Sequence, residues 1–490
     1  MATLITPVRA APPLAPATSE PTTTPARRLV TRLDQLQRFP QTRPDGTVGL
    51  AVMDSAGRQL AGRNADRPML PASTMKLVTA AAALRLLGPG YRFVTRVYAT
   101  AEVDADGVVD GDLVIVGGGD PVLATPTFMR DVNNARPATP LADLATRVAR
   151  AGLTRVTGRV IGDPSVLADE PLADGWRPRY LTTLDASRSS GLTVDAGVRL
   201  FKRSGVLYAE AAKDPAVRTA GQLHELLDAR GVRIEHAPAS RRGPRPAGVE
   251  IARVSSPPLS TLLTHALQTS DNHLADGIFR MLGAATGDPT WAGSARATQH
   301  ALADIAGAGP PAGGNPSKTA SPSEPAGGDP RARASIRLAD GSGLSRRDRL
   351  TANATVRLLH TMANGPLRSE WLRIQATAGE SGTMRLRLVG TQAKGRVHAK
   401  TGTLQDVRAL AGTVPGSGGR DYHFAVFAND LGQYADIAAA RRLADVIALA
   451  LVVEQDGCDG PIPVPDTNKA RAPEAAICGR EAGTEELAPR

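Results

Sequence analysis

The residue pattern of the sequence changes twice along the chain, from helix-forming to strand-forming and back, and these two changes constrain the fold more than any other feature. Residues 73–87 are rich in good helix formers and end at a Gly-Pro-Gly triplet, which predicts a helix. From 91 to about 250 the sequence consists of short β-like runs broken by Gly and Asp, with helical stretches near 141–151 and 219–231. Helix formers then return at 260–282. A β-rich segment therefore interrupts a helical one.

The C-terminal part predicts an antiparallel sheet. Strand-like runs lie at 396–400, 408–414 and 422–427, and a loop of hairpin type, rich in Pro, Gly and Ser, joins the last two. A similar hairpin is predicted from residue 47, and a helix at 434–453 comes last. Together these elements predict an α+β domain that is interrupted by a smaller β-rich inserted domain.

The domain boundaries follow from these changes in composition. A Pro/Thr/Ala-rich N-terminal segment predicts a flexible tail, and a Gly/Pro/Ser-rich stretch without periodicity predicts a long loop. The predicted units are the tail at 1–28, the main domain at 29–94 and 251–456 with the loop at 308–333, the inserted domain at 95–250, and a C-terminal tail at 457–490.

Composition excludes several classes of protein. Hydrophobic residues make up 42% and charged residues 22% of the chain, which excludes wholesale disorder, and no apolar run is long enough to predict a membrane span. The net charge of +10 comes almost wholly from arginine, because only 7 of the 58 basic residues are lysine. Since the arginines are scattered and aromatic residues make up only 3%, nucleic-acid binding is not predicted. Compositional bias or a polyanionic partner in the cell envelope remains open.

The two cysteines bear on the compartment. Cys458 and Cys478 lie in a Pro/Gly-rich C-terminal stretch, where a disulfide is favoured and two unpaired thiols are the alternative. A disulfide would indicate an oxidising compartment, although the N-terminus shows no apolar core of a signal peptide. Neither the cysteines nor the eight histidines show metal-ligand spacing, so a metal site is not predicted.

Three short polar motifs carry the chemical signal. Ser73-x-x-Lys76 opens the first predicted helix, Ser270-Asp271-Asn272 lies in the later helical region, and Lys400-Thr401-Gly402 ends a predicted strand. Each motif alone is weak, whereas all three in this order are unlikely to arise by chance.

The spacing of the first motif suits nucleophilic catalysis. Residues i and i+3 of a helix share a face, so the Lys76 amine can reach the Ser73 hydroxyl. Serine is a poor nucleophile until a base takes its proton, and a lysine can do so once its pKa is lowered. Burial and a second cation nearby, such as Lys400, would both lower the pKa of Lys76.

This set of motifs resembles the penicillin-binding proteins and class A β-lactamases. The wide separation of Ser73 from Ser270 and the lack of an E-x-x-L-N sequence argue against a β-lactamase. The large insert is similar to that of the low-molecular-mass class C penicillin-binding proteins, the D-alanyl-D-alanine carboxypeptidase/endopeptidase family. The passages that also resemble this family are Gly117-x-Gly119-Asp120-Pro121, Ser256-Pro257-Pro258-Leu259, Asp340-Gly341-Ser342-Gly343-Leu344-Ser345, Gly382-Thr383-Met384 and Lys400-Thr401-Gly402-Thr403.

The resemblance implies a catalytic domain of the penicillin-binding and serine β-lactamase type, which acts on peptidoglycan stem peptides and needs no metal or organic cofactor. Ser73 would form the acyl-enzyme and Lys76 would be its general base. Ser270, bridging Lys76 and Lys400, would pass a proton to the leaving amine, and Asn272 would hold the substrate amide or the lysine network. The residues implied in binding the substrate carboxylate and the extended peptide are Lys400, Thr401, Gly402 and Thr403, and the backbone N–H groups of Ser73 and Thr403 would form the oxyanion hole.

Three features depart from the family or lie beside its motifs. Asp276 stands where the family usually has glutamate. Asp214 follows Asp195 within about twenty residues, which implies that a third domain of the relatives is reduced or missing here. Arg346 could recognise a carboxylate on a substrate side chain, although a solvated arginine is an equally good interpretation.

The sequence thus predicts a serine-type D-alanyl-D-alanine carboxypeptidase/endopeptidase, inhibited by β-lactams and located outside the cytoplasm, in the periplasm, the cell envelope or the medium. The alternatives are a β-lactamase or esterase on the same catalytic fold, and a non-catalytic protein that binds the cell wall. The oligomeric state is not predicted.

Overall fold

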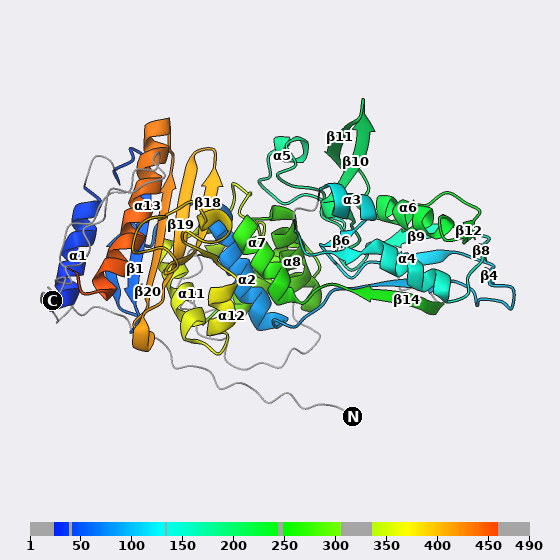
Figure 1. Cartoon of the computed structure of the whole chain (residues 1–490), viewed down its shortest axis with the longest axis horizontal. Coiled ribbons are helices and arrows are strands. Elements are labelled where there is room, and N and C mark those ends of the chain that lie inside the picture. Colours follow the sequence, from blue (N-terminus) through cyan, green and yellow to red (C-terminus); the bar gives the residue numbers. More distant parts are fainter. Residues whose placement is uncertain (1–23, 39–41, 133–134, 244–247, 305–335, 459–490) are drawn as a thin grey trace, which may run out of the picture.

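A computed structural model describes residues 24–38, 42–132, 135–243, 248–304 and 336–458. The molecule is elongated, with two bodies side by side along its long axis (Figure 1). The larger body holds a six-stranded sheet and most of the long helices. The smaller body lies between β3 (Val94–Ala99) and β14 (Val249–Ser255), which pair with each other in antiparallel fashion where the chain leaves and re-enters the larger body.

The main sheet has the strand order β17-β18-β19-β20-β1-β2, and every neighbouring pair is antiparallel. Two strands come from before the inserted body and four from after it, so the sheet joins the two parts of the chain. The bounds are β1 Thr47–Asp54, β2 Gln59–Arg63, β17 Ala376–Thr377, β18 His398–Leu404, β19 Val407–Val414 and β20 Tyr422–Asn429.

Both faces of this sheet are covered, and the residues of β1 show how the two faces divide. Leu50 and Val52 point into one apolar cluster, whereas Ala51 and Met53 point into another, because successive side chains of a strand alternate between faces. The helices that pack on the first face are α1 (Thr24–Leu36) and α13 (Tyr434–Gln455), and α11 (Ala352–Asn364) packs on the second.

Helix α2 (Met75–Leu86) lies at the centre of the larger body. Nearly all of its residues are buried, including the four alanines at 80–83, and it is apolar on all sides, as a helix surrounded by protein must be. The helices around it are α7 (Leu259–Thr269), α8 (Asn272–Ala285) and α9 (Trp291–Ala301). The short elements that complete this body are α12 (Arg368–Arg373), β15 (Ile336–Arg337) and β16 (Arg349–Leu350).

Two predicted elements differ from the structure. The predicted helix 260–282 is two helices, because Ser270 adopts a left-handed conformation (φ 64°) that ends α7 and the Asp271 side chain caps α8 by accepting from Leu274 N. The motif at Lys400 does not end its strand, since β18 continues to Leu404 and turns back only at 405–406. The second motif thus lies at the junction of two helices, and the third lies inside a strand.

The smaller body has its own apolar core beneath a five-stranded sheet of order β13-β9-β5-β3-β14, with α4 and α6 packed against it. A hairpin, β10–β11, projects from it (Figure 1) in the stretch where the sequence implied a reduced domain. The bounds are α3 Pro126–Asp131, α4 Leu141–Arg150, α5 Arg179–Thr182, α6 Pro215–Asp228, β4 Val108–Val109, β5 Leu113–Val116, β6 Leu123–Ala124, β7 Thr139–Pro140, β8 Arg155–Val156, β9 Val160–Asp163, β10 Val198–Arg203, β11 Val206–Ala211, β12 Arg233–Ile234 and β13 Ala239–Ser240.

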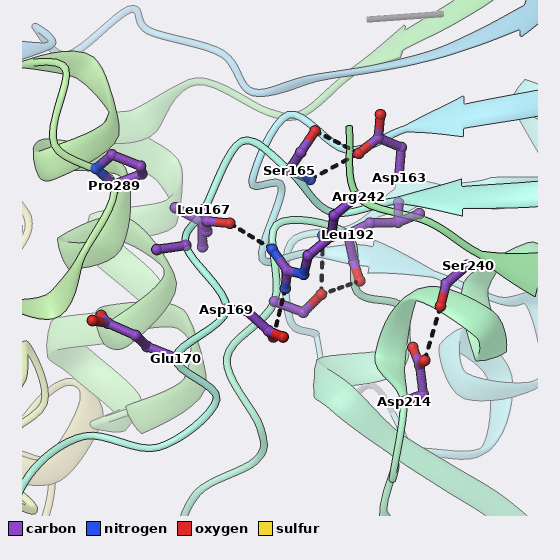
Figure 2. Close-up of polar contacts among 12 residues, drawn as sticks. Asp163, Ser165, Leu167, Asp169, Glu170, Leu192, Asp214, Ser240, Arg242 and Pro289 are labelled. Atoms are coloured by element: carbon purple, nitrogen blue, oxygen red, sulfur yellow. Dashed lines mark hydrogen bonds and ion pairs between the residues drawn. The ribbon is translucent and has the colours of Figure 1, made fainter. Parts of the chain in front are cut away.

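The segment that follows β9 is held from both bodies. Arg242 of the smaller body donates to the Leu167 carbonyl oxygen at 2.8 Å and to the Asp169 carboxylate at 2.9 Å (Figure 2). On its other side, Arg280 of α8 donates to the Ala168 carbonyl oxygen at 3.0 Å, and the Trp291 indole donates to the Glu170 carbonyl oxygen at 2.9 Å. These contacts fix the start of the segment 164–192, which runs on across the larger body.

Helix α1 begins at Thr24, inside the stretch predicted to be a tail, because Leu29, Leu33 and Leu36 form an apolar stripe that packs with α13. The predicted loop at 308–333 and Cys478, the proposed partner of Cys458, lie outside the described residues, so both remain predictions. Within the described ranges, no helix combines the length and the apolar character that crossing a bilayer requires.

Candidate active site

Ser73 lies on a short 3₁₀ turn, Ala72–Thr74, directly before α2. The preceding Ala72 has φ 47°, a left-handed conformation that is costly for a residue with a side chain. Gly343 packs so closely on this turn that a Cβ there would lie 1.9 Å from the Ala72 carbonyl oxygen, so no larger residue fits. The strained turn presents Ser73 at the N-terminus of a buried helix, where unpaired N–H groups favour negative charge.

Lys76 makes three hydrogen bonds through its amine. It contacts Ser73 Oγ at 2.9 Å, Asn272 Oδ1 at 2.7 Å and the Ser342 carbonyl oxygen at 2.8 Å. Among these partners only the Ser73 hydroxyl can also donate, because the other two oxygens are acceptors alone. A neutral Lys76 would therefore give its two hydrogens to Asn272 and Ser342 and turn its lone pair toward the Ser73 hydroxyl.

The surroundings of Lys76 favour that neutral form. Burial lowers the pKa of Lys76 from 10.5 to about 8, and the carboxylates of Asp276 and Asp340 oppose the shift. The pKa of Asp276 is itself raised well above its usual range by burial and by Asp340, which weakens its opposition at neutral pH. Near pH 8 about half of the Lys76 amines are therefore neutral.

The second motif contributes three residues with different positions. Asn272 Nδ2 donates to the Asp185 carbonyl oxygen at 2.9 Å, which orients the amide so that its oxygen faces Lys76. Ser270 lines the same cleft as Ser73, but the hydrogen bonds of the described residues do not join it to Lys76 or to Lys400. Asp271 caps α8 and lies 3.3 Å from Arg136 Nε. Asp271 therefore has a structural role, in helix capping and in an ion pair, that accounts for its place in the motif.

The third motif lies on β18, which contacts the turn that carries Ser73. Lys400 is fully buried and its amine donates to the Thr401 carbonyl oxygen at 2.9 Å. Burial and the charge of Lys76 hold the pKa of Lys400 well below its usual range. A Cβ on Gly402 would lie 2.8 Å from the Pro71 carbonyl oxygen, so glycine permits the close approach of strand and turn.

Five residues of the three motifs line an open cleft of about 530 Å³: Ser73, Ser270, Asn272, Thr401 and Thr403. Thr401 and Thr403 line it from β18, and the segment 164–192 contributes Arg179 and Tyr180 of α5 together with Asp185. The lining residues that the sequence did not single out as site residues are Arg179, Tyr180, Asp185, Leu344, Thr383, Leu404, Gln405 and Arg408. Among these residues, only Thr383 and Leu344 could have been found from the sequence, since each lies in a passage that resembles the family.

Arg346 lies away from this lining. Its guanidinium forms a two-pronged ion pair with Asp406, with distances of 2.7 and 2.8 Å to the two carboxylate oxygens. The pair joins the loop after Asp340 to the turn between β18 and β19, so it supports the cleft wall. A role for Arg346 in substrate recognition remains a prediction.

The sequence matches the D-Ala-D-Ala carboxypeptidase 3 (S13) family over residues 33–204, 201–308 and 332–450. It is 30% identical to a D-alanyl-D-alanine carboxypeptidase from an Actinomadura strain over 451 residues, which cover 76% of each chain. It is also 30% identical to carboxypeptidase DacB of Mycolicibacterium smegmatis over 465 residues, which cover 91% of this chain and 90% of the relative.

The fold is similar to that of penicillin binding protein 4 (dacB) from Haemophilus influenzae. The TM-score is 0.66 at 21% identity, and the similarity covers 84% of this chain and 97% of the other. A second crystal structure of that protein, in complex with a β-lactam, matches with a TM-score of 0.61 at 20% identity over the same shares. The likeness confirms the α+β penicillin-binding fold that the motifs predicted.

Proposed function

The chain belongs to the D-Ala-D-Ala carboxypeptidase 3 (S13) family and is a serine-type peptidase of peptidoglycan, and from that premise we propose which of its residues carry out the reaction. The nucleophile is Ser73 and the general base is Lys76. The observation that carries this proposal is the hydrogen-bond set of Lys76, in which Ser73 is the only partner able to donate a proton.

The proposed reaction has two steps. The Ser73 oxygen attacks the carbonyl carbon between the two terminal D-alanines while its proton passes to Lys76, and the backbone N–H groups of Ser73 and Thr403 stabilise the oxyanion. The C–N bond then breaks, and the leaving D-alanine amine takes the proton from Lys76 through Ser270. An acyl-enzyme remains on Ser73. Water cleaves this ester, which returns the proton to Ser73 and releases the shortened peptide.

Asn272 and the β18 residues hold the reacting groups in this proposal. Asn272 is anchored on the Asp185 carbonyl oxygen and keeps the Lys76 amine aimed at Ser73. Thr401 and Thr403 receive the substrate carboxylate, and Gly402 lets the strand approach the Ser73 turn. The Lys400 amine donates to the Thr401 carbonyl oxygen and so helps to fix the backbone of β18.

We further propose that residues 29–94 and 251–456 form the catalytic domain and that the inserted domain, 95–250, supplies one wall of the cleft through Asp185 and α5. The partners are peptidoglycan stem peptides and, as inhibitors, β-lactams, whose strained amide and carboxylate resemble the D-alanyl-D-alanine end. A protein with these substrates acts outside the cytoplasm, where peptidoglycan lies.

The assignment of Ser73 is tested by labelling with a fluorescent penicillin, followed by mass mapping of the modified peptide. We expect one label on Ser73 and none in Ser73→Ala, whose melting temperature should match the wild type because the hydroxyl contributes little to packing. Label that persists in Ser73→Ala, or that maps to another serine, would refute the assignment. Rapid turnover of the penicillin instead of a long-lived acyl-enzyme would favour a β-lactamase.

A further inference from the structure

The strand that carries the substrate threonines presents its two faces to different surroundings. Side chains alternate along a strand, so Thr401 and Thr403 share one face of β18 while Lys400 and Gly402 share the other. Gly402 packs against the Ser73 turn, and Lys400 is fully buried and does not line the cleft. The cation of the motif is thus on the face opposite the two threonine side chains.

Another cation lies on the threonine face. Arg408 of β19 pairs directly with Thr403 across the sheet, so the two side chains are neighbours. Arg408 lines the cleft together with Ser73, Thr401 and Thr403. It also lines a second cavity of about 310 Å³, which lies between β18 and α13 and shares both threonines with the cleft.

Arg408 has no carboxylate partner among the described residues. One of its terminal nitrogens donates to the carbonyl oxygens of Leu404 and Val407, both at 2.7 Å, which aligns the guanidinium beside the hairpin turn. Its other nitrogens have no partner in the described part of the chain. Arg441 of α13 lines the second cavity as well, and burial together with the charge of Arg441 lowers the pKa of Arg408. The ion pairs of the described residues include neither Arg408 nor Arg441, and two neighbouring cations of this kind make a site for an anion.

The cleft itself would attract the same charge. Its lining holds two cations, Arg179 and Arg408, and a single carboxylate, Asp185. A neighbouring arginine, Arg346, is paired with Asp406, so the carboxylate at the hairpin turn is already engaged. The anion that reaches this wall in the reaction is the carboxylate at the end of the substrate, one residue beyond the carbonyl that Ser73 attacks.

We propose that Arg408, rather than the buried Lys400, supplies the positive charge that binds the terminal carboxylate of the substrate between Thr401 and Thr403. This inference rests on the proposed function of the cleft. It assigns Arg408 to substrate binding, and it gives Arg441 the secondary task of strengthening the field in the adjoining cavity.

The test compares two probes that differ only in the charge of one group, benzylpenicillin and its methyl ester. Arg408→Ala should lower the second-order rate of acylation by benzylpenicillin about 10- to 100-fold, the range for a lost hydrogen bond to an ionised partner, and should change the rate for the ester less than about 3-fold. Arg408→Lys should restore part of the loss. Arg385→Ala, which removes an exposed charge from the same lobe outside both cavities, is the matched control and should leave both rates unchanged.

Equal losses for acid and ester in Arg408→Ala would mean that the arginine only supports the hairpin, and unchanged rates would remove it from binding; either result overturns the proposal. A binding measurement in Ser73→Ala keeps the test separate from catalysis. There an acetylated L-lysyl-D-alanyl-D-alanine peptide should bind more tightly than its C-terminal amide, and Arg408→Ala should abolish that preference. Failure of the wild type to be labelled would count against the proposed function alone, since the peptide preference would still decide the role of Arg408.

Discussion

The two faces of the main sheet treat buried cations in opposite ways. On the α13 face, Arg387 is nearly buried and its guanidinium lies 2.7 Å from the Asp445 carboxylate. On the face toward the Ser73 turn, Lys76 and Lys400 are more deeply buried, yet the hydrogen bonds of the described structure give them only hydroxyl, amide and carbonyl oxygens. Arg387 thus has a carboxylate in direct contact, whereas Lys76 and Lys400 have only neutral oxygens.

This difference separates a stabilising cation from a reactive one. A carboxylate in direct contact raises the pKa of a cation and keeps its proton in place, whereas burial among neutral oxygens lowers the pKa. Arg387 has the first environment and joins α13 to the stretch between residue 384 and β18. Lys76 has the second, and its pKa of about 8 lets it accept and return a proton near neutral pH.

The largest expected effect comes from replacing Lys76, the reactive cation of this comparison. Lys76→Arg keeps a cation beside Ser73, but a guanidinium does not give up its proton near neutral pH. We expect acylation by benzylpenicillin to fall about 1,000-fold or more, the scale of a lost general base, and to match the loss in Lys76→Ala. Stopped-flow fluorescence of labelling measures both rates. An arginine variant that acylates at a rate near the wild type would place the base elsewhere.

How much of this site could be predicted from the sequence depends on the range of each contact. The pair Ser73 and Lys76 was predictable, since three positions on one helix bring the side chains together. The Ser342 and Asp185 carbonyl oxygens were not, because backbone groups carry no residue signature and both loops come from distant parts of the chain. Both decide how the Lys76 network is oriented.

The same limit applies to the charges around the cleft. In the sequence, nothing distinguishes the environment of Arg346 from that of Arg408. The folded chain places Asp406 against Arg346, and the register of the β18–β19 hairpin places Thr403 beside Arg408. The break at Ser270 did have a local signal, since residues 269–273 are poor helix formers and Asp271 in front of Asn272 is a good capping residue. A polar residue inside an apolar helical run was the available signal.

The second prediction concerns the stabilising cation, Arg387, and its partner Asp445. Asp445→Ala leaves the Arg387 guanidinium buried without its partner, which should lower the free energy of unfolding by about 3 kcal/mol. Chemical denaturation at neutral pH measures this loss. The matched control is Arg387→Met with Asp445→Leu, which removes both charges and should recover most of the stability. A loss below about 1 kcal/mol in the single variant would show that the pair does not hold α13.

The third and smallest prediction sharpens the comparison through Lys400. Its pKa in the folded protein lies below the ordinary 10.5, so at neutral pH the unfolded chain binds the proton more tightly and the buried lysine costs stability. The cost shrinks as the pH rises toward 10.5. Lys400→Met should therefore raise the free energy of unfolding at pH 7 by on the order of 1 kcal/mol, with an unchanged value for the exposed Lys394→Met. A destabilised Lys400→Met would show that the lysine contributes more through its bond to Thr401 than it costs.

The most direct test of the central claim is the pH profile of acylation in the wild type and in Asn272→Asp. This substitution keeps the shape of the side chain but places a carboxylate where Asn272 Oδ1 now lies 2.7 Å from the Lys76 amine. The wild-type rate should rise with pH and reach half its maximum near pH 8, because the neutral amine is the active form. In Asn272→Asp the midpoint should move up by more than about one pH unit, whereas Asn272→Ala, which adds no charge, should show no such rise. Equal midpoints in the wild type and Asn272→Asp would contradict the claim that Lys76 acts as a base because it lacks a carboxylate partner.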